Sequence, residues 1–398
     1  MLPVMQIFNH KALMRIALVI AFVQFTNALE YMVFNPVFVF MATDFAVPVS
    51  FSGYVSGMYT LGAVISGVIA FYWIDHFNKK DFLIANMALL GLLTLLTTCI
   101  SSFSLLLALR FCAGLVGGTT MGVGISILIN NAPPNLRGKM LATVIGSFSI
   151  VSIVGMPTIL FLCTHYDWHV ALWLISALCV LALPLIVSII PQDPVSLDTF
   201  PKLPLDRDTL LFASSNALVQ FSPMLVIPIL APLMIQQLGA SQDLLPWLFF
   251  SGGVIGYLST KITGVLTSRF SALMMATAST IVFILSLLIL ILGYQHATLF
   301  ISLFLGASYS RLVTSSVVSI QFPDDRQRAG FSSLQTSIMY LVTTIAFFLS
   351  AFLLPVHGMA PQNVNKLLVI CAIFAAGFPI LVIILKKKLA KRFHLRQF

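Results

Sequence analysis

One acidic side chain, Glu30, lies in the middle of the first long apolar stretch and is the only glutamate among the 398 residues. An ionised side chain at the centre of a bilayer costs about 2.5–3.5 kcal/mol or more, so an acid placed there is a candidate for proton binding. On a helix with 100° per residue, the neighbouring polar side chains fall with Glu30 within an arc of about 140°. These neighbours are Gln24, Asn27, Tyr31 and Asn35. The spacing predicts a polar helix face along a pathway for a substrate and for protons.

Two arginines, Arg110 and Arg311, also lie within apolar stretches. Because arginine stays protonated in a protein, each must face a partner or water. Arg110 could be a counter-charge that tunes Glu30 or holds an anionic substrate, or it could be a brace onto helix carbonyls. An ion pair with Arg110 that only holds the first helix against the fourth is the alternative role for Glu30. Arg311 shares one side of its helix with serine and threonine side chains, which indicates the wall of a polar cavity.

Amide and aromatic side chains in the apolar stretches could orient a substrate in a largely apolar pocket. For each of them, a hydrogen bond between helices is an alternative. The predicted substrate-cavity residues are Gln24, Asn27, Tyr31, Arg110, Asn216, Gln220, Arg311 and Gln335, and the predicted proton-coupling pair is Glu30 and Arg110.

No serine, cysteine or histidine constellation in the sequence is typical of catalysis or of a metal site. The five cysteines all fall within apolar segments, without the spacing of a metal site or a disulfide framework. We therefore expect neither an enzyme nor a bound cofactor.

Composition indicates the class of protein that must position these groups. Hydrophobic residues make up 59% and charged residues 8% of the chain, against about 25% charged residues in an ordinary soluble domain. This balance predicts an all-α membrane protein with many spans. The net charge of +9 does not indicate a nucleic-acid partner, because the basic residues do not cluster on one soluble face.

Apolar stretches of membrane-spanning length recur along the chain and predict twelve transmembrane helices. Their limits are 13–41, 51–74, 82–100, 103–129, 140–163, 168–190, 208–236, 243–266, 272–293, 297–320, 331–355 and 364–386. The polar, proline-broken segment 191–207 divides the spans into two six-helix bundles, 1–190 and 208–386, and a basic tail follows at 387–398.

The basic residues predict the orientation. With both termini in the cytoplasm, 18 of the 21 lysines and arginines fall on the cytoplasmic side. The basic residues at the end of the chain would also bind anionic lipid of the inner leaflet.

The two halves share a short repeat. Residues 23–26, Val-Gln-Phe-Thr, match residues 219–222, Val-Gln-Phe-Ser, at an offset of 196, and at the same offset Pro36 matches Pro232. Matches at corresponding places in two bundles predict a duplicated transporter with its site near the midplane between the halves.

Twelve spans, a long central connection and an internal repeat resemble the major facilitator superfamily. The loop after helix 2 in that family carries G-x-x-x-D-R/K-x-G-R/K-K/R, and this chain keeps its aspartate and basic pair as Asp75, Lys79 and Lys80. A second copy keeps Gly264 and Arg269. The resemblance implies that Asp75 caps a neighbouring helix and latches the outward-facing state.

Further matches narrow the resemblance. Arg110 to Gly114 is similar to the R-x-x-x-G core of proton-coupled facilitators, and Gly155 with Pro157 resembles the glycine-proline motif of drug/proton antiporters. Residues 167–173 are similar to the start of helix 6 in bacterial sugar and drug efflux permeases.

The resemblance implies a monomeric, proton-coupled exporter of a drug, metabolite or siderophore in the bacterial inner membrane, working by alternating access. An uptake symporter for a small anionic metabolite is the alternative, and a non-transporting receptor is a third.

Overall fold

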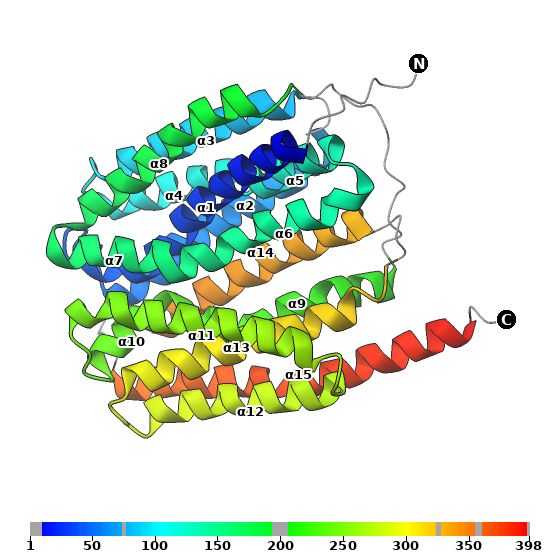
Figure 1. Cartoon of the computed structure of the whole chain (residues 1–398). Coiled ribbons are helices and arrows are strands. Elements are labelled where there is room, and N and C mark those ends of the chain that lie inside the picture. The colour runs from blue at the N-terminus through cyan, green and yellow to red at the C-terminus, as the bar shows by residue number, and fades with distance from the viewer. Residues whose placement is uncertain (1–9, 74–76, 193–205, 324–327, 355–359, 396–398) are drawn as a thin grey trace, which may run out of the picture. The chain divides into compact units, whose positions relative to one another are not determined.

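The computed structural model describes residues 10–73, 77–192, 206–323, 328–354 and 360–395. All regular structure in these ranges is helical, which confirms the predicted fold class (Figure 1). The chain divides into two compact units. The first unit contains Met1–Phe34 and Met58–Asp198, and the second contains Asn35–Gly57 and Thr199–Phe398. The predicted limits of the two bundles stay a prediction.

The described part of the first half of the chain forms eight α-helices. They are α1 (His10–Met41), α2 (Ser52–Trp73), α3 (Lys79–Thr97), α4 (Phe103–Gly117), α5 (Thr120–Asn131), α6 (Pro134–Ile150), α7 (Met156–His165) and α8 (Trp168–Ile189). The predicted span 103–129 is interrupted at Gly118 and Thr119, between α4 and α5. A π-helical turn, Val151–Gly155, joins α6 to α7 within the predicted span 140–163.

The described part of the second half forms seven α-helices. They are α9 (Arg207–Val226), α10 (Leu230–Gln236), α11 (Leu245–Leu266), α12 (Ala272–Ile291), α13 (Ala297–Ser319), α14 (Arg328–Leu353) and α15 (Pro361–Leu395). A short 3₁₀ turn, Ile227–Ile229, separates α9 from α10. Pro228 lies in this turn, and a proline cannot donate the backbone hydrogen bond that a continuous helix would need there.

Eleven segments of the described chain are long and apolar enough to cross a membrane. The predicted span 243–266 forms the 22-residue helix α11 but is not among the eleven. This helix contains Gly252, Gly253, Gly256 and Lys261, which lower its average hydropathy. The chain is a multi-pass membrane protein, and the count of twelve spans stays a prediction.

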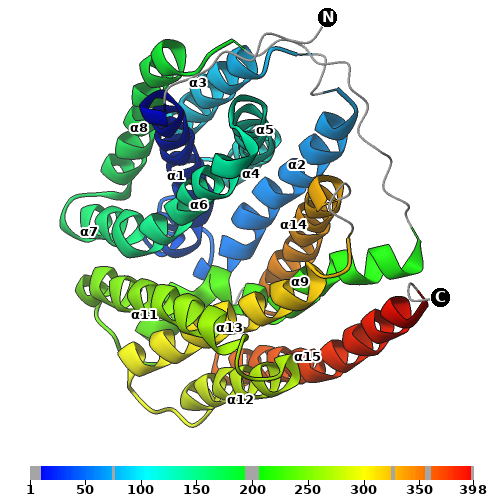
Figure 2. The same cartoon turned by 45° about the vertical axis from the view of Figure 1, so that its right-hand side comes forward.

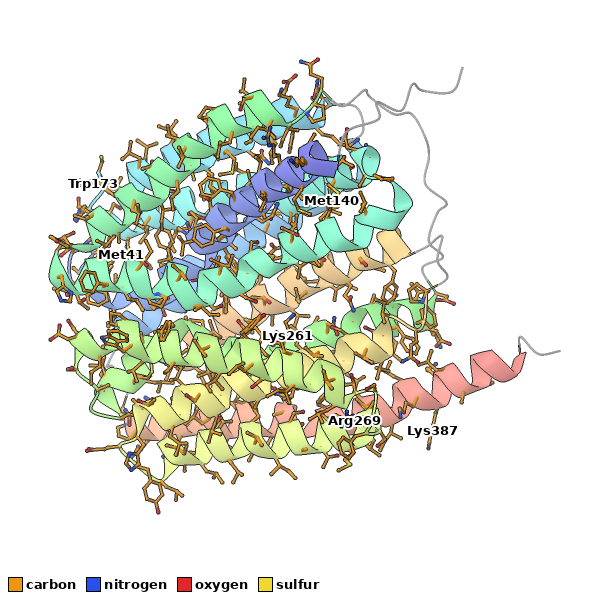
Figure 3. The ribbon with its side chains drawn as sticks, in the orientation of Figure 1. Met41, Met140, Trp173, Lys261, Arg269 and Lys387 are labelled. Atoms are coloured by element: carbon orange, nitrogen blue, oxygen red, sulfur yellow. The ribbon has the colours of Figure 1, made fainter. Side chains whose placement is uncertain are left out.

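Each unit has an outer pair of helices that lie side by side. In the first unit α3 lies against α8, and in the second α12 lies against α15 (Figures 1 and 2). Within the second unit, Arg269 and Lys387 lie at one end and Met41 lies at the opposite end (Figure 3). The predicted orientation requires this separation, because it places Arg269 and Lys387 in the cytoplasm and the end of the first span, at Met41, on the external side.

A capping interaction holds the start of α8. The Asp167 carboxylate accepts a hydrogen bond from His169 N at 2.7 Å and also contacts His169 Nδ1. Burial acts to raise the pKa of Asp167, but the hydrogen bonds from His169 outweigh it and hold the pKa below its ordinary value of 3.8. Asp167 therefore stabilises the fold above about pH 4, and this contribution is lost as the pH falls through its lowered pKa.

Replacing Asp167 by Ala should lower the free energy of unfolding by about 1 kcal/mol near neutral pH, because the helix loses its cap. The difference from the parent protein should shrink as the pH falls through the lowered pKa of Asp167. Asp167→Asn is the matched control, since asparagine caps equally well but does not titrate. Thermal melting of the purified protein across this pH range measures both variants. A deficit in Asp167→Ala that is equal at every pH would contradict the assigned role of the carboxylate.

Candidate functional site

Glu30 of α1 and Arg110 of α4 form an ion pair in the interior of the first unit. Arg110 Nη1 donates to Glu30 Oε1, and the side chains are 1% and 0% exposed. Thr94 Oγ1 of α3 donates to the same carboxylate oxygen at 3.4 Å. Three helices therefore meet at one buried carboxylate, and no part of Glu30 faces lipid.

Aromatic rings enclose the charged end of Arg110. Its guanidinium carbon lies 3.7 Å from the centre of the Phe34 ring and 4.7 Å from that of Tyr59. The Tyr59 ring also stacks on Tyr31 at 5.0 Å between centroids. A cation over aromatic faces is stabilised in the absence of water. The rings thus hold Arg110 against Glu30 and exclude solvent from the pair.

Glycines on α4 allow α2 to approach this site closely. A Cβ added at Gly114 would collide with the Tyr59 carbonyl oxygen, and one at Gly117 would meet the Tyr59 hydroxyl and Asn27 Oδ1. Small residues at helix crossings are typical of membrane bundles. The glycines of α4 therefore act in packing and set the distance at which Tyr59 covers Arg110.

Several polar atoms around the ion pair have no hydrogen-bond partner among the described residues. They are Glu30 Oε2, Arg110 Nε and Nη2, and Asn27 Oδ1. Buried polar groups are normally satisfied, and those left unsatisfied mark places where a proton, water or ligand group can bind. The site can thus accept a proton at Glu30 and offer donors from Arg110.

Three of the predicted cavity amides bond to neighbouring helices. Gln24 Nε2 donates to the Thr120 carbonyl at 3.0 Å, and Asn216 Nδ2 donates to Ser316 Oγ at 2.9 Å. Gln335 Nε2 donates to Ser319 Oγ at 3.3 Å. These contacts are hydrogen bonds between helices, which the sequence left open as the alternative to a cavity role. Gln220 is 8% exposed, and its Oε1 has no partner among the described residues.

Arg311 of α13 faces two outer helices of the second unit. Its Nη2 donates to the Ala375 carbonyl of α15 at 3.3 Å. Its guanidinium carbon lies 4.6 Å from the Phe283 ring of α12 and 5.5 Å from the Phe378 ring of α15. The contact with Ala375 is a brace onto a helix carbonyl. No carboxylate pairs with Arg311 within the part of the chain that the structure describes.

The predicted conformational motif is only partly visible, because Asp75 lies outside the described residues. Asn78, which the sequence analysis did not single out, caps α3 by accepting from Lys80 N at 3.0 Å. Lys80 Nζ donates to the Val187 carbonyl of α8 at 2.8 Å, and Lys79 is buried. Lys80 therefore fastens the start of α3 to α8 within the first unit.

The other motif residues occupy helix ends and crossings. Gly155 ends the π-helical turn before Pro157, and a Cβ at Gly155 would come within 2.9 Å of Leu29 Cδ1 on α1. Gly264 meets no atom within 4 Å of an added Cβ, and Arg269 is exposed. Gly155 thus permits close packing on the helix that carries Glu30, whereas Gly264 has no such role.

The structure adds three residues to the site that sequence reasoning missed. Thr94, Tyr59 and Phe34 contact Glu30 or Arg110 directly. A polar threonine within an apolar span was the available signal for Thr94. Nothing in the sequence distinguished Tyr59 or Phe34 from other aromatic residues of the spans.

Comparison with known proteins places these features in a family context. A family model described as Major Facilitator Superfamily matches residues 20–212. The chain is 22% identical over 328 residues to the purine ribonucleoside efflux pump NepI of Escherichia coli O6:H1, covering 80% of this chain and 82% of the pump. It is also 25% identical over 157 residues to the niacin transporter NiaP of Acinetobacter baylyi, covering 38% and 35% of the two chains.

Solved structures share the fold. A bacterial homologue of the human lysosomal transporter Spinster, inward-facing and unoccupied, aligns with a TM-score of 0.74 at 15% identity, over 96% of this chain and 99% of that one. A D-xylose-proton symporter aligns with a TM-score of 0.72 at 16% identity, over 92% and 97% of the two chains.

Proposed function

Since the chain belongs to the major facilitator superfamily, we propose that it exports a small molecule across the bacterial inner membrane in exchange for protons. The ion pair of Glu30 with Arg110, fully buried and still holding unsatisfied atoms, is the observation that carries this proposal. Both termini lie in the cytoplasm in this proposal, and alternating access moves the substrate.

A proton on Glu30 would change the partner of Arg110. While Glu30 is ionised, the two charges neutralise each other inside an apolar bundle. Once the carboxyl is protonated, Arg110 keeps its charge and must find another acceptor. Coupling follows from this exchange of partners: proton binding frees Arg110 to move or to hold a substrate oxygen, and proton release restores the pair.

The energy for export comes from the proton gradient. A proton that moves down a potential of 100 mV releases about 2.3 kcal/mol. Because the carboxyl is enclosed by α1, α3 and α4, a proton can reach it only when helices of the bundle move. Opening alternately to each side would then let Glu30 load outside and unload inside.

Purine ribonucleosides are the first substrates to test. The similarity to NepI extends along four fifths of the chain, and the atoms of Asn27 and Arg110 at the candidate site that have no partner among the described residues suit the polar groups of a nucleoside. The prediction is that inside-out vesicles with an acidic lumen accumulate labelled adenosine or inosine, whereas vesicles without a pH gradient do not. Accumulation that requires an alkaline lumen would reverse the assigned direction.

An uptake symporter for a small anionic metabolite is the second candidate. The absence of a carboxylate partner for Arg311 among the described residues favours it, because a substrate anion could supply the missing charge. Right-side-out vesicles with an alkaline lumen distinguish the two: they should accumulate an anionic substrate only if the protein works as a symporter.

A further inference from the structure

The two units differ in how they neutralise a buried arginine. Arg110 and Arg311 are each 1% exposed and lie on α4 and α13. Arg110 has Glu30 as its counter-charge. A buried charge without a counter-ion is strongly unfavourable, so an anion bound beside Arg311 would stabilise it.

The second half of the sequence offers no acid in the interior of its spans. Its acidic residues lie at span ends or in connections, and they are Asp206, Asp208, Asp243, Asp324 and Asp325. The second half therefore supplies no carboxylate from within a span as a counter-charge for Arg311.

Arg311 has atoms without a partner in the described chain, as do other buried polar residues of α13 and of the helices packed against it. Its own Nε and Nη1 have none among the described residues, and the same is true of the hydroxyls of Ser222, Thr280 and Ser315. These residues are buried, at 8% exposure or less. All five atoms can donate a hydrogen bond, whereas none is a carboxylate oxygen or an amide oxygen. A buried positive charge with free donors on its own helix and on the adjacent helices is suited to an anion and unsuited to a cation.

These donors lie on α13 itself or on α9 and α12, which pack against it. Ser315 is four residues after Arg311 on α13, and Thr280 is three residues before Phe283, whose ring faces the guanidinium. Ser222 of α9 contacts α15, because Cys371 Sγ of α15 donates to the Ser222 carbonyl at 3.1 Å. Cys371 in turn lies four residues before Ala375, the residue that braces Arg311.

We propose that Arg311, with the hydroxyls of Thr280, Ser315 and Ser222, forms a buried site for one monovalent anion in the second unit. The chemistry fits a halide or a single carboxylate group. The Phe283 and Phe378 rings hold the guanidinium from two sides, which keeps its free nitrogens available. The site does not depend on proton coupling at Glu30, which lies in the first unit.

Anion-dependent stability of the full-length protein tests this proposal. The purified chain is melted in chloride-free buffer with gluconate, and chloride is then titrated in at constant ionic strength. Anion binding should raise the apparent Tm by a few degrees, and the rise should saturate. A parallel titration with formate distinguishes the sources: a response to chloride assigns a halide site, and a response to formate alone assigns a site for a carboxylate group of a substrate.

Variants separate this site from general charge effects. Arg311→Met should abolish the response, whereas Arg269→Met removes an exposed positive charge of the same unit and should keep it. Thr280→Asp supplies a carboxylate from the chain, so it should melt at or above the parent in chloride-free buffer and no longer respond to anions. The proposal is overturned if neither anion stabilises the parent protein, or if Thr280→Asp responds as the parent does. Loss of transport in a Glu30 variant has no bearing on this readout.

Discussion

Replacing Glu30 by Gln should abolish proton-driven accumulation of substrate in vesicles while substrate exchange without a gradient continues. Glutamine has the shape of a protonated glutamate and can still accept from Arg110 and Thr94, but it cannot carry a proton. One proton per substrate at a gradient of one pH unit supports about tenfold accumulation, equivalent to about 1.4 kcal/mol. The variant should reach no accumulation above that of vesicles without a gradient.

The control for this experiment is Asp167→Asn, which removes an acid from the start of α8 without touching the buried pair. It should accumulate substrate as the parent protein does. If Glu30→Gln also accumulates substrate normally, Glu30 only holds α1 against α4. If the variant loses exchange together with accumulation, a melting curve shows whether the bundle has lost its fold.

Replacing Arg110 by Gln should destabilise the protein more than a single substitution at Asp167 or Arg311. The substitution leaves the Glu30 carboxylate buried at 0% exposure without its counter-charge, and breaking a buried pair on one side costs about 3–5 kcal/mol. The double variant Glu30→Gln/Arg110→Gln removes both charges, so it should recover most of this loss. Thermal melting of the three variants and the parent at neutral pH gives the coupling energy between the two sites.

Arg311→Gln is the matched comparison for the Glu30 and Arg110 variants. It removes an equally buried arginine, but no carboxylate of the described chain loses its partner as a result. The loss of stability should therefore be smaller than for Arg110→Gln. Additive effects in the double variant would show that Glu30 and Arg110 do not stabilise each other.

The sequence by itself determined the class of the protein. Composition and the lengths of the apolar stretches predicted an all-helical membrane protein, and the structure confirms it for the residues that it describes. The physical reason is that backbone N–H and C=O groups in lipid find no water and must hydrogen-bond to each other. A helix achieves this within one segment, so an apolar stretch of sufficient length becomes a helix. The motifs around Asp75, Arg110 and Gly155 likewise led to the superfamily whose family model matches residues 20–212. Glu30 was found from its rarity and its place in an apolar stretch.

Only the tertiary structure decided which partner each buried polar group takes. The sequence left open whether Arg110 pairs with Glu30 and placed Arg311 at a polar cavity wall; in the structure Arg110 meets Glu30, and Arg311 meets a carbonyl and two rings. Helical periodicity states which side of a helix a residue occupies, but not which neighbouring helix covers that side. That choice depends on how closely the helices approach, and at Gly114 and Gly117 the missing side chains let Tyr59 reach Arg110. An arginine in an apolar span can be either half of an ion pair or a charge without a counter-ion. Only the contacts between distant segments show which of the two it is.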